Sequence, residues 1–237
     1  MEKTKSQKKR VAIIATVVCL ALAAGLGTYA WLSAQSSLTN TFTVGSINQP
    51  DKKPDPDQPD KPGTDDWNVD GNLIETNWIQ DSKLVPGGTV DKNPNVGLGA
   101  GSDNSYVFVY VKNALVNQKA GTTDTPYFTI NDGWKAVDAQ TNGTAGQYVS
   151  GLFMYATDGT VPALLNASES SDVYTGELFS KVIVPSTLTK DMVNTNDQGK
   201  ADMVVSCYIF GDGQQGDKAS AAENALAQAK SWAETQK

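Results

Sequence analysis

The residues that could do chemistry are few in this chain. It has no histidine among its 237 residues, and its two cysteines are Cys19 and Cys207. Without an imidazole, Ser-His-Asp and Cys-His triads and the HExxH zinc site are excluded. Zinc sites rely on His and Cys, so we predict no catalytic residue, no metal site and no cofactor. Cys207 lies in an apolar stretch and is expected to be an inert buried thiol.

Acidic side chains are the remaining candidates for metal binding, and the distribution of charge along the chain excludes some classes of partner. The loops Asp191–Asp202 and Asp212–Asp217 could offer oxygen ligands to calcium, but neither has the EF-hand spacing, and we interpret them as solvated loop charge. The formal net charge is -7, with about +4 in residues 1–30 and about -11 in the remainder. An acidic body argues against nucleic acid or an anionic membrane surface as a partner.

The N-terminus has the pattern of a secretory signal peptide. A basic stretch ending at Arg10 is followed by the apolar run Val11–Leu26 and then by small residues. Thr28 and Ala30 occupy positions -3 and -1 of a cleavage site, which predicts a signal peptide over 1–30 and a mature chain starting at Trp31. An uncleaved membrane anchor is the alternative, because Val11–Leu32 is long enough to span a bilayer. We expect a secreted protein that meets the membrane only through an uncleaved signal segment.

Two further segments precede the body of the chain. Residues 31–49 contain Thr39–Ile47, an uncharged, β-prone stretch that we predict to be one strand. Residues 50–66 carry five of the ten prolines, alternating with charge, and predict an extended polyproline II spacer that separates this strand from the body. The strand could pair with its own body or be donated to another copy of the chain. Its candidate residues are Thr41, Phe42, Thr43, Val44, Gly45, Ser46 and Ile47.

The body, residues 67–237, is predicted to be an all-β, jelly-roll-like antiparallel sandwich followed by a C-terminal helix. Strands 105–116 and 201–210 are bulky on both faces, as expected in the middle of a covered sheet. Ser220–Thr235 has apolar residues at helical spacing and a capping box from Ser220 to Glu223, and should cover an edge or an end of the sandwich. The other predicted strands are Asn72–Ile79, Thr89–Val96, Tyr127–Asn131, Gln147–Ala156 and Glu177–Val184.

The stretch Leu84–Val96 contains a turn followed by a predicted edge strand. Pro86-Gly87 fits the central positions of a type II turn, because proline presets φ and glycine accepts a positive φ. Val90, Lys92, Pro94 and Val96 then alternate along one strand. Lys92 lacks the partners of a catalytic lysine and is interpreted as a solvated charge that prevents mispairing of the edge.

Three stretches together resemble the TasA/camelysin family of secreted Gram-positive proteins. Gly25–Ala30, followed by Thr39–Gly45, resembles the signal-peptide region handled by SipW-type signal peptidases, in which a G-x-G-T-[YW]-A exit is followed by an N-T-F-T-x-G strand. The third stretch is Leu84–Val96, which is followed by Tyr106-Val107-Phe108-Val109. It is similar to the family's L-x-P-G-x-x-V-x-K-x-P-x-V motif and the Y-V-F-V that follows it. Its matching residues are Leu84, Pro86, Gly87, Val90, Lys92, Pro94 and Val96.

The resemblance implies a jelly-roll fold, export by a SipW-type peptidase, and a place at the cell surface or in the biofilm matrix. For TasA-like members it implies fibres in which an N-terminal strand is donated to the next subunit, so the expected partner is the chain itself. In such chains the first strand leads directly into the sandwich, whereas here residues 50–66 intervene. Two alternatives stay open, namely a camelysin-like surface metalloprotease and an adhesin that binds carbohydrate through Trp67, Trp78 or Trp134.

Overall fold

The computed structural model describes residues 46–68, 71–79, 82–194, 202–212 and 218–237. The chain divides into two compact units, Met1–Val44 and Gly45–Lys237. All described residues belong to the second unit, so the predicted signal peptide with Thr28 and Ala30, and the expected mature start at Trp31, lie outside them. Within the described residues, no helix is long and apolar enough to cross a membrane.

The larger of two sheet layers is built around β6. This strand pairs along its whole length with β12 on one side, while β8, and beyond it β7, extend the sheet on the other. A short strand, β9, pairs with the first residues of β6. All pairings are antiparallel. The bounds are β6 Ser105–Asn113, β7 Trp134–Thr141, β8 Tyr148–Tyr155, β9 Leu164–Leu165 and β12 Met203–Gly211.

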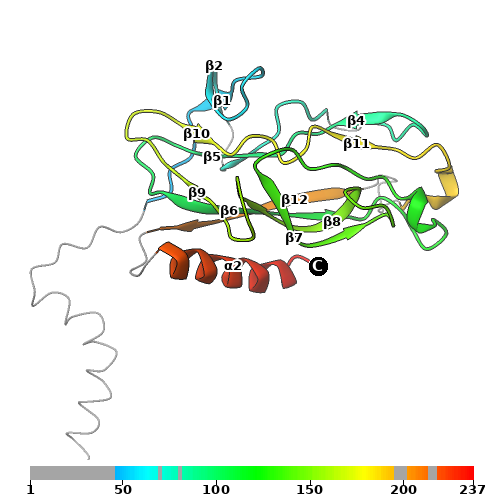
Figure 1. Ribbon diagram of the computed structural model, residues 1–237. Helices are drawn as coiled ribbons and strands as arrows, with labels where there is room; N and C mark the ends of the chain where they lie inside the picture. The colour runs from blue at the N-terminus through cyan, green and yellow to red at the C-terminus, as the bar shows by residue number, and fades with distance from the viewer. Residues whose placement is uncertain (1–45, 69–70, 80–81, 195–201, 213–217) are drawn as a thin grey trace, which may run out of the picture. The chain divides into compact units, whose positions relative to one another are not determined.

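The second layer consists of short strands that lie over this sheet (Figure 1). It contains a three-stranded group in the order β10-β5-β3 and the pair β11-β4, again antiparallel. Two 3-10 turns, η2 Thr122–Asp124 and η3 Lys190–Met192, lie in the connections. The strand bounds are β3 Leu73–Ile74, β4 Thr89–Asp91, β5 Asn95–Leu98, β10 Val173–Tyr174 and β11 Lys181–Ile183.

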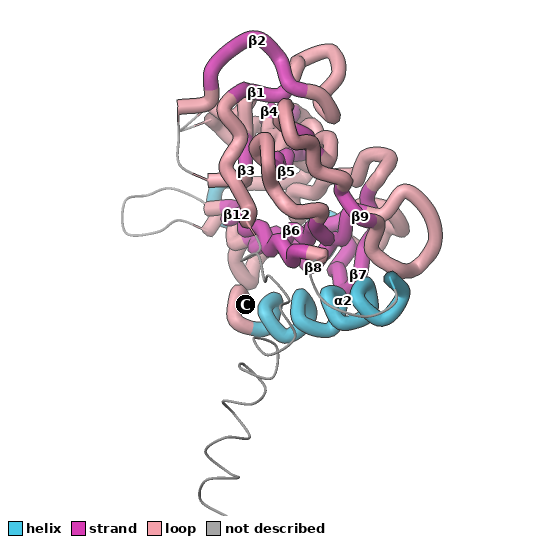
Figure 2. Tube along the Cα trace, turned by 90° about the vertical axis from the view of Figure 1, so that its left-hand side faces the viewer, coloured by secondary structure: helices cyan, strands magenta, loops and turns pink. Residues whose placement is uncertain are grey.

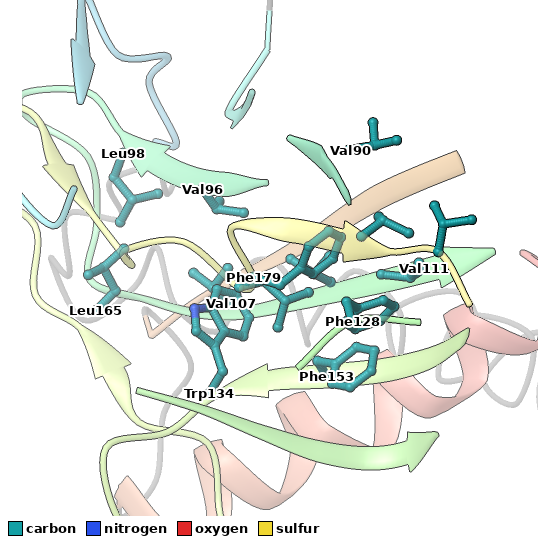
Figure 3. Close-up of a cluster of buried hydrophobic side chains, with 14 of the residues drawn as sticks. Val90, Val96, Leu98, Val107, Val111, Phe128, Trp134, Phe153, Leu165 and Phe179 are labelled. Carbon is teal, nitrogen blue, oxygen red and sulfur yellow. The ribbon is translucent and has the colours of Figure 1, made fainter. Parts of the chain in front are cut away.

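One hydrophobic core fills the space between the layers (Figure 3). Val107, Val109 and Val111 point into it from β6, and Phe128 stacks on Phe179 with ring centroids 4.2 Å apart. The alternation of β6 therefore places every second side chain in this core. These features confirm the predicted all-β antiparallel sandwich.

The C-terminal helix α2, Lys218–Glu234, covers the opposite face of the five-stranded sheet (Figures 1 and 2). Its alanines, among them the fully buried Ala225 and Ala229, pack on Tyr106, Phe108 and Tyr110 of β6. The prediction of a helix is confirmed, but its expected place at an edge or an end of the sandwich is wrong. Ser220 already lies inside the helix, so the predicted capping box is wrong as well.

The proline-rich stretch 50–66 is not an extended spacer. It forms a β-hairpin in which β1, Lys52–Pro54, pairs with β2, Pro62–Asp66. Its tip is closed by backbone hydrogen bonds, including Asp55 N to Lys61 O at 2.8 Å. Prolines fit this structure because proline has no backbone N–H to donate. At the first residue of a strand, or on the outer side of an edge strand, no N–H is needed for a hydrogen bond between strands. The compact body therefore starts at Gly45 rather than at Trp67.

Several other strand boundaries differ from the prediction. The expected single strand 89–96 is divided between β4 and β5, which belong to different groups of the second layer. Residues 127–131 contribute only isolated bridges at Tyr127 and Phe128. β7 was not predicted, because its charged and small residues lack the apolar alternation of a typical strand.

Candidate assembly interface

The outer edge of β12 is the most distinctive surface feature of the described residues. β12 is the last strand of its sheet, and its nine residues keep one uninterrupted register with β6, from Met203 opposite Asn113 to Gly211 opposite Ser105. In an antiparallel pair, every second residue directs its N–H and C=O away from the partner. Among the described residues, no hydrogen bond reaches these outward groups.

The side chains of β12 are apolar but incompletely covered. Met203, Val205, Cys207 and Ile209 pack against the inter-sheet core, and Tyr208 and Phe210 pack on the helix side. All six are only half-buried, and Val204 is 52% exposed. A further strand beside β12 would therefore remove both apolar surface and unpaired backbone groups from water.

β7, at the other edge of the same sheet, has the features by which proteins prevent strand addition. Its register is interrupted between Ala136 and Asp138 and again between Gln140 and Thr141. It also carries the exposed charges of Lys135 and Asp138. Bulges and charges of this kind block edge-to-edge pairing. β12 has no register shift and no charged residue, so the two edges of one sheet differ in their openness to a new strand.

The position of β12 corrects a prediction from the sequence. Its bulky residues were expected in the middle of a sheet, yet the strand lies at the edge. Both of its faces are partly covered, one by the second layer and one by α2, which explains the apolar residues on both faces. The sequence of a strand indicates whether its two faces are covered, but it does not indicate whether a second strand pairs with each of its edges.

Cys207 lies on this edge and is half-buried rather than fully buried. Burial raises the pKa of its thiol to about 11. A thiol with this raised pKa is neutral at physiological pH, and the neutral form is the less reactive one.

The predicted N-terminal strand is only partly described, since Thr41, Phe42, Thr43, Val44 and Gly45 lie outside the described residues. Ser46 and Ile47 are not in a strand, but they are not detached from the body either. The segment Ser46–Pro50, here called the strap, runs antiparallel along residues 99–103. Asp103 N donates to Ser46 O at 2.8 Å, and Gly99 N donates to Asn48 O at 2.9 Å.

Two glycines allow the strap to lie this close. A Cβ atom on Gly97 would lie 2.6 Å from Cγ of Pro50, and one on Gly99 would overlap the backbone carbonyl of Gln49. The strap then turns into the hairpin at the buried Asp172. Oδ2 of this carboxylate accepts hydrogen bonds from the backbone N–H groups of Asp51 and Lys52, at 2.9 and 2.8 Å. The predicted detachment of this region is therefore wrong.

The turn of the Leu84–Val96 stretch forms as predicted. Gly88 N donates to Val85 O at 2.8 Å, and Gly87 has φ of +78°, as a type II turn requires. Leu84 is half-buried against the core, whereas Val90, Pro94 and Val96 are buried.

Lys92 is a buried cation and not the solvated edge charge that was predicted. It is 5% exposed, its Nζ donates to Glu75 Oε2 at 2.8 Å, and it lies 4.7 Å from the ring centroid of Trp78. Asn93 next to it is also buried and binds the side chains of Thr76 and Glu177. Together these contacts tie the segment after β3 to the segment after β4.

The other candidate ligand residues are placed as follows. Trp134 is a core residue, 2% exposed, while Trp78 is 40% exposed and partly covered by Lys92. The Trp67 indole N–H donates to Gly71 O. Most of the two acidic loops lies outside the described residues. Within the residues that are described, no group of three or more metal-ligating side chains occurs.

The chain matches no protein-family model, no curated protein and no solved structure.

Proposed function

We propose that this chain is a secreted, non-enzymatic structural protein of the bacterial cell surface or biofilm matrix, and that it assembles with copies of itself through the edge of β12. The observation that carries the proposal is the nine-residue, uncharged and uninterrupted edge strand. A strand of that length with free backbone groups is a template for an added strand. The signal-like N-terminus and the likeness to the TasA/camelysin family support export and a fibre-forming role.

The β-prone residues Thr39–Gly45 are the proposed added strand. They are uncharged, and Phe42 and Val44 lie on one face of an extended chain, where they would meet the half-buried apolar side chains of β12. The hairpin also supports this proposal. Because residues 50–66 fold onto the body, the N-terminal segment leads directly into the sandwich at the strap, as in the family that the sequence resembles.

A charge on the β12 edge should prevent assembly without unfolding the protein. Val204→Lys places an ammonium group on an edge that would be buried by an added strand, and burial of an unpaired charge is strongly unfavourable. Val161→Lys is the matched control, since Val161 is 49% exposed, close to the 52% of Val204, and lies outside the sheet.

The measurement is the size distribution of the purified secreted chain at rising concentration, by light scattering and negative-stain imaging. We expect polymers for the parent and for Val161→Lys, and folded monomers for Val204→Lys. A parent that stays monomeric at every concentration, or a Val204→Lys variant that polymerises like the parent, contradicts the proposal.

A further inference from the structure

A cavity lies beside β7, at the edge of the large sheet that is protected from strand addition. Its volume is about 620 Å³, within the range of about 300–1,000 Å³ that small-molecule sites occupy. One helix is narrower than the sheet that it covers. α2 packs on β6, β8 and β12, and four strands about 4.8 Å apart extend beyond a helix about 10 Å wide. A space therefore remains between α2 and the outermost strand, β7.

Two lysines from different elements line this cavity. Lys135 belongs to β7 and Lys230 to α2, and both residues are exposed. Within the described part of the chain, neither of them forms an ion pair. The chain as a whole is acidic, so two ammonium groups without a counter-charge beside one cavity are a local exception. They favour a ligand that carries a negative charge.

Two further polar side chains at the cavity narrow the class of ligand. Asp132 is also a lining residue, and its ionised carboxylate accepts hydrogen bonds but repels a second anion. Thr160, in the turn after β8, contributes a hydroxyl that donates and accepts. These groups suit a ligand whose hydroxyls bind Asp132 and Thr160 while its anionic group lies near the lysines.

The cavity also has an apolar part. Met154, which is 4% exposed, and the half-buried Val137 and Leu226 belong to the cluster between the sheet and α2, and Tyr148 adds an aromatic ring. An inorganic anion would leave this surface in contact with water. A purely aliphatic ligand would remove the polar groups from water without giving them partners. A sugar ring meets both requirements, because its C–H groups are apolar and its hydroxyls form hydrogen bonds.

We infer that this cavity binds an acidic sugar, that is, a sugar that carries a carboxylate, and that Lys135 and Lys230 supply the charge that selects it. The inference does not depend on assembly through β12, which lies at the opposite edge of the same sheet. In a polymer joined at β12, every subunit would keep this cavity open.

Calorimetric titration of the purified secreted chain with digalacturonate tests the inference. The dimethyl ester of digalacturonate has the same rings and hydroxyls without the charge, so it separates recognition of the carboxylate from recognition of the sugar. Lys135→Gln and Lys230→Gln each remove one charge without changing a buried residue. Lys181→Gln is the matched control, because Lys181 is exposed on β11 and does not line the cavity. Inorganic phosphate serves as a competitor.

We expect saturable binding of digalacturonate, weakened about threefold by each cavity variant and about tenfold by the double variant, since exposed charges contribute modestly. The dimethyl ester should bind about tenfold more weakly than the acid, and Lys181→Gln should bind like the parent. The inference is overturned by no binding at millimolar concentration, by equal affinity for the ester, or by a double variant that binds like the parent. A loss in Lys181→Gln equal to that in the cavity variants, or displacement by an equal concentration of phosphate, would show non-specific binding of anions and overturns it as well.

Discussion

Lys92 shows how burial changes the role of a charged side chain. Its ammonium group is removed from water and is compensated by the Glu75 carboxylate and the face of Trp78. Breaking a buried ion pair leaves an unpaired buried charge, which is more costly than replacing both partners by apolar groups. The side chain of Glu75 is 19% exposed, and Lys92 Nζ lies 2.8 Å from both of its carboxylate oxygens. Apart from this ion pair, Oε1 has no hydrogen-bond partner among the described residues. The carboxylate therefore depends strongly on Lys92.

Removing this lysine should destabilise the body. We expect Lys92→Met to lower the free energy of unfolding by about 3–5 kcal/mol, because the Glu75 carboxylate stays buried without its counter-charge. The double variant Lys92→Met with Glu75→Leu should recover most of this loss. Urea denaturation followed by tryptophan fluorescence measures both values.

The exposed ion pair of the hairpin, Lys52 with Asp66, serves as the control. Solvent-exposed pairs contribute little, so Lys52→Met should leave the urea midpoint nearly unchanged. Equal losses for Lys52→Met and Lys92→Met would show that burial of Lys92 has no energetic role.

The sequence predicts the local geometry of a residue better than its tertiary environment. The Pro86-Gly87 turn was predictable because its geometry depends on adjacent residues. The environment of Lys92 was not, since Glu75 and Trp78 reach it from a segment after β3 that is 14 to 17 positions earlier in the chain. A lysine between two strand-forming residues looks the same in sequence whether a distant loop covers it or not.

At the scale of elements, the strap is held by backbone contacts that only glycine permits. Gly99 lies under the carbonyl of Gln49, and its N–H donates to Asn48 O. The strap was not predictable, because only Ser46 and Ile47 belong to the β-prone stretch, residues 48–50 have neither strand alternation nor apolar bulk, and their partners are about fifty positions away. β6 and α2 were predictable, since apolar periodicity and helix propensity are local properties.

A side chain at Gly99 should displace the strap while the sandwich stays folded. We expect Gly99→Ala to lower the free energy of unfolding by about 1–3 kcal/mol, as is usual when added volume meets a packed neighbour. Limited proteolysis should then cleave near Gln49 faster than in the parent, because the released backbone becomes accessible. Gly211→Ala is the control, since its Cβ would meet no atom. Unchanged cleavage in Gly99→Ala would mean that the strap is not fixed by this contact.

At the scale of the whole molecule, the two edges of the large sheet differ in how readily they would accept an added strand. β7 is protected by bulges and charge, and β12 is not. The sequence predicted the sandwich and the β-prone N-terminal segment. It did not predict which strand would lie at the open edge, because that depends on the order of strands in the sheet.

The labelling rate of the Cys207 thiol reports how accessible the β12 edge is. Because burial raises the pKa of its thiol to about 11 from the ordinary 9.0, only about one thiol in a thousand is ionised at pH 8, and the thiolate is the reactive form. We expect maleimide labelling of the monomer to be slow at pH 8 and to rise about tenfold per pH unit toward pH 11. The folded state retains its proton to a higher pH than the unfolded state, so the free energy of unfolding should fall as the pH rises from about 9 to about 11.

Assembly should slow this labelling further. A strand added beside β12 covers Cys207, so polymers at the same pH should label more slowly than monomers of Val204→Lys. Reaction with dithiobis(nitrobenzoate), which forms a mixed disulfide with Cys207 and releases thionitrobenzoate, reports the rate in both samples through the absorbance of the released anion. Polymers whose Cys207 reacts as fast as that of the monomer would indicate assembly through a different surface.

The hairpin of residues 51–67 begins and ends at one place. Trp67 N donates to Asp51 O at 2.7 Å, so the chain leaves the sandwich and returns to it across a single hydrogen bond. Such a segment can change length without moving the strands on either side of it, which explains how a sandwich could acquire it as an insertion. A peptide tag inserted at its exposed tip, between Asp57 and Gln58, would occur once in every subunit and project from the body, so a polymer of this chain could serve as a scaffold that displays cargo at regular intervals.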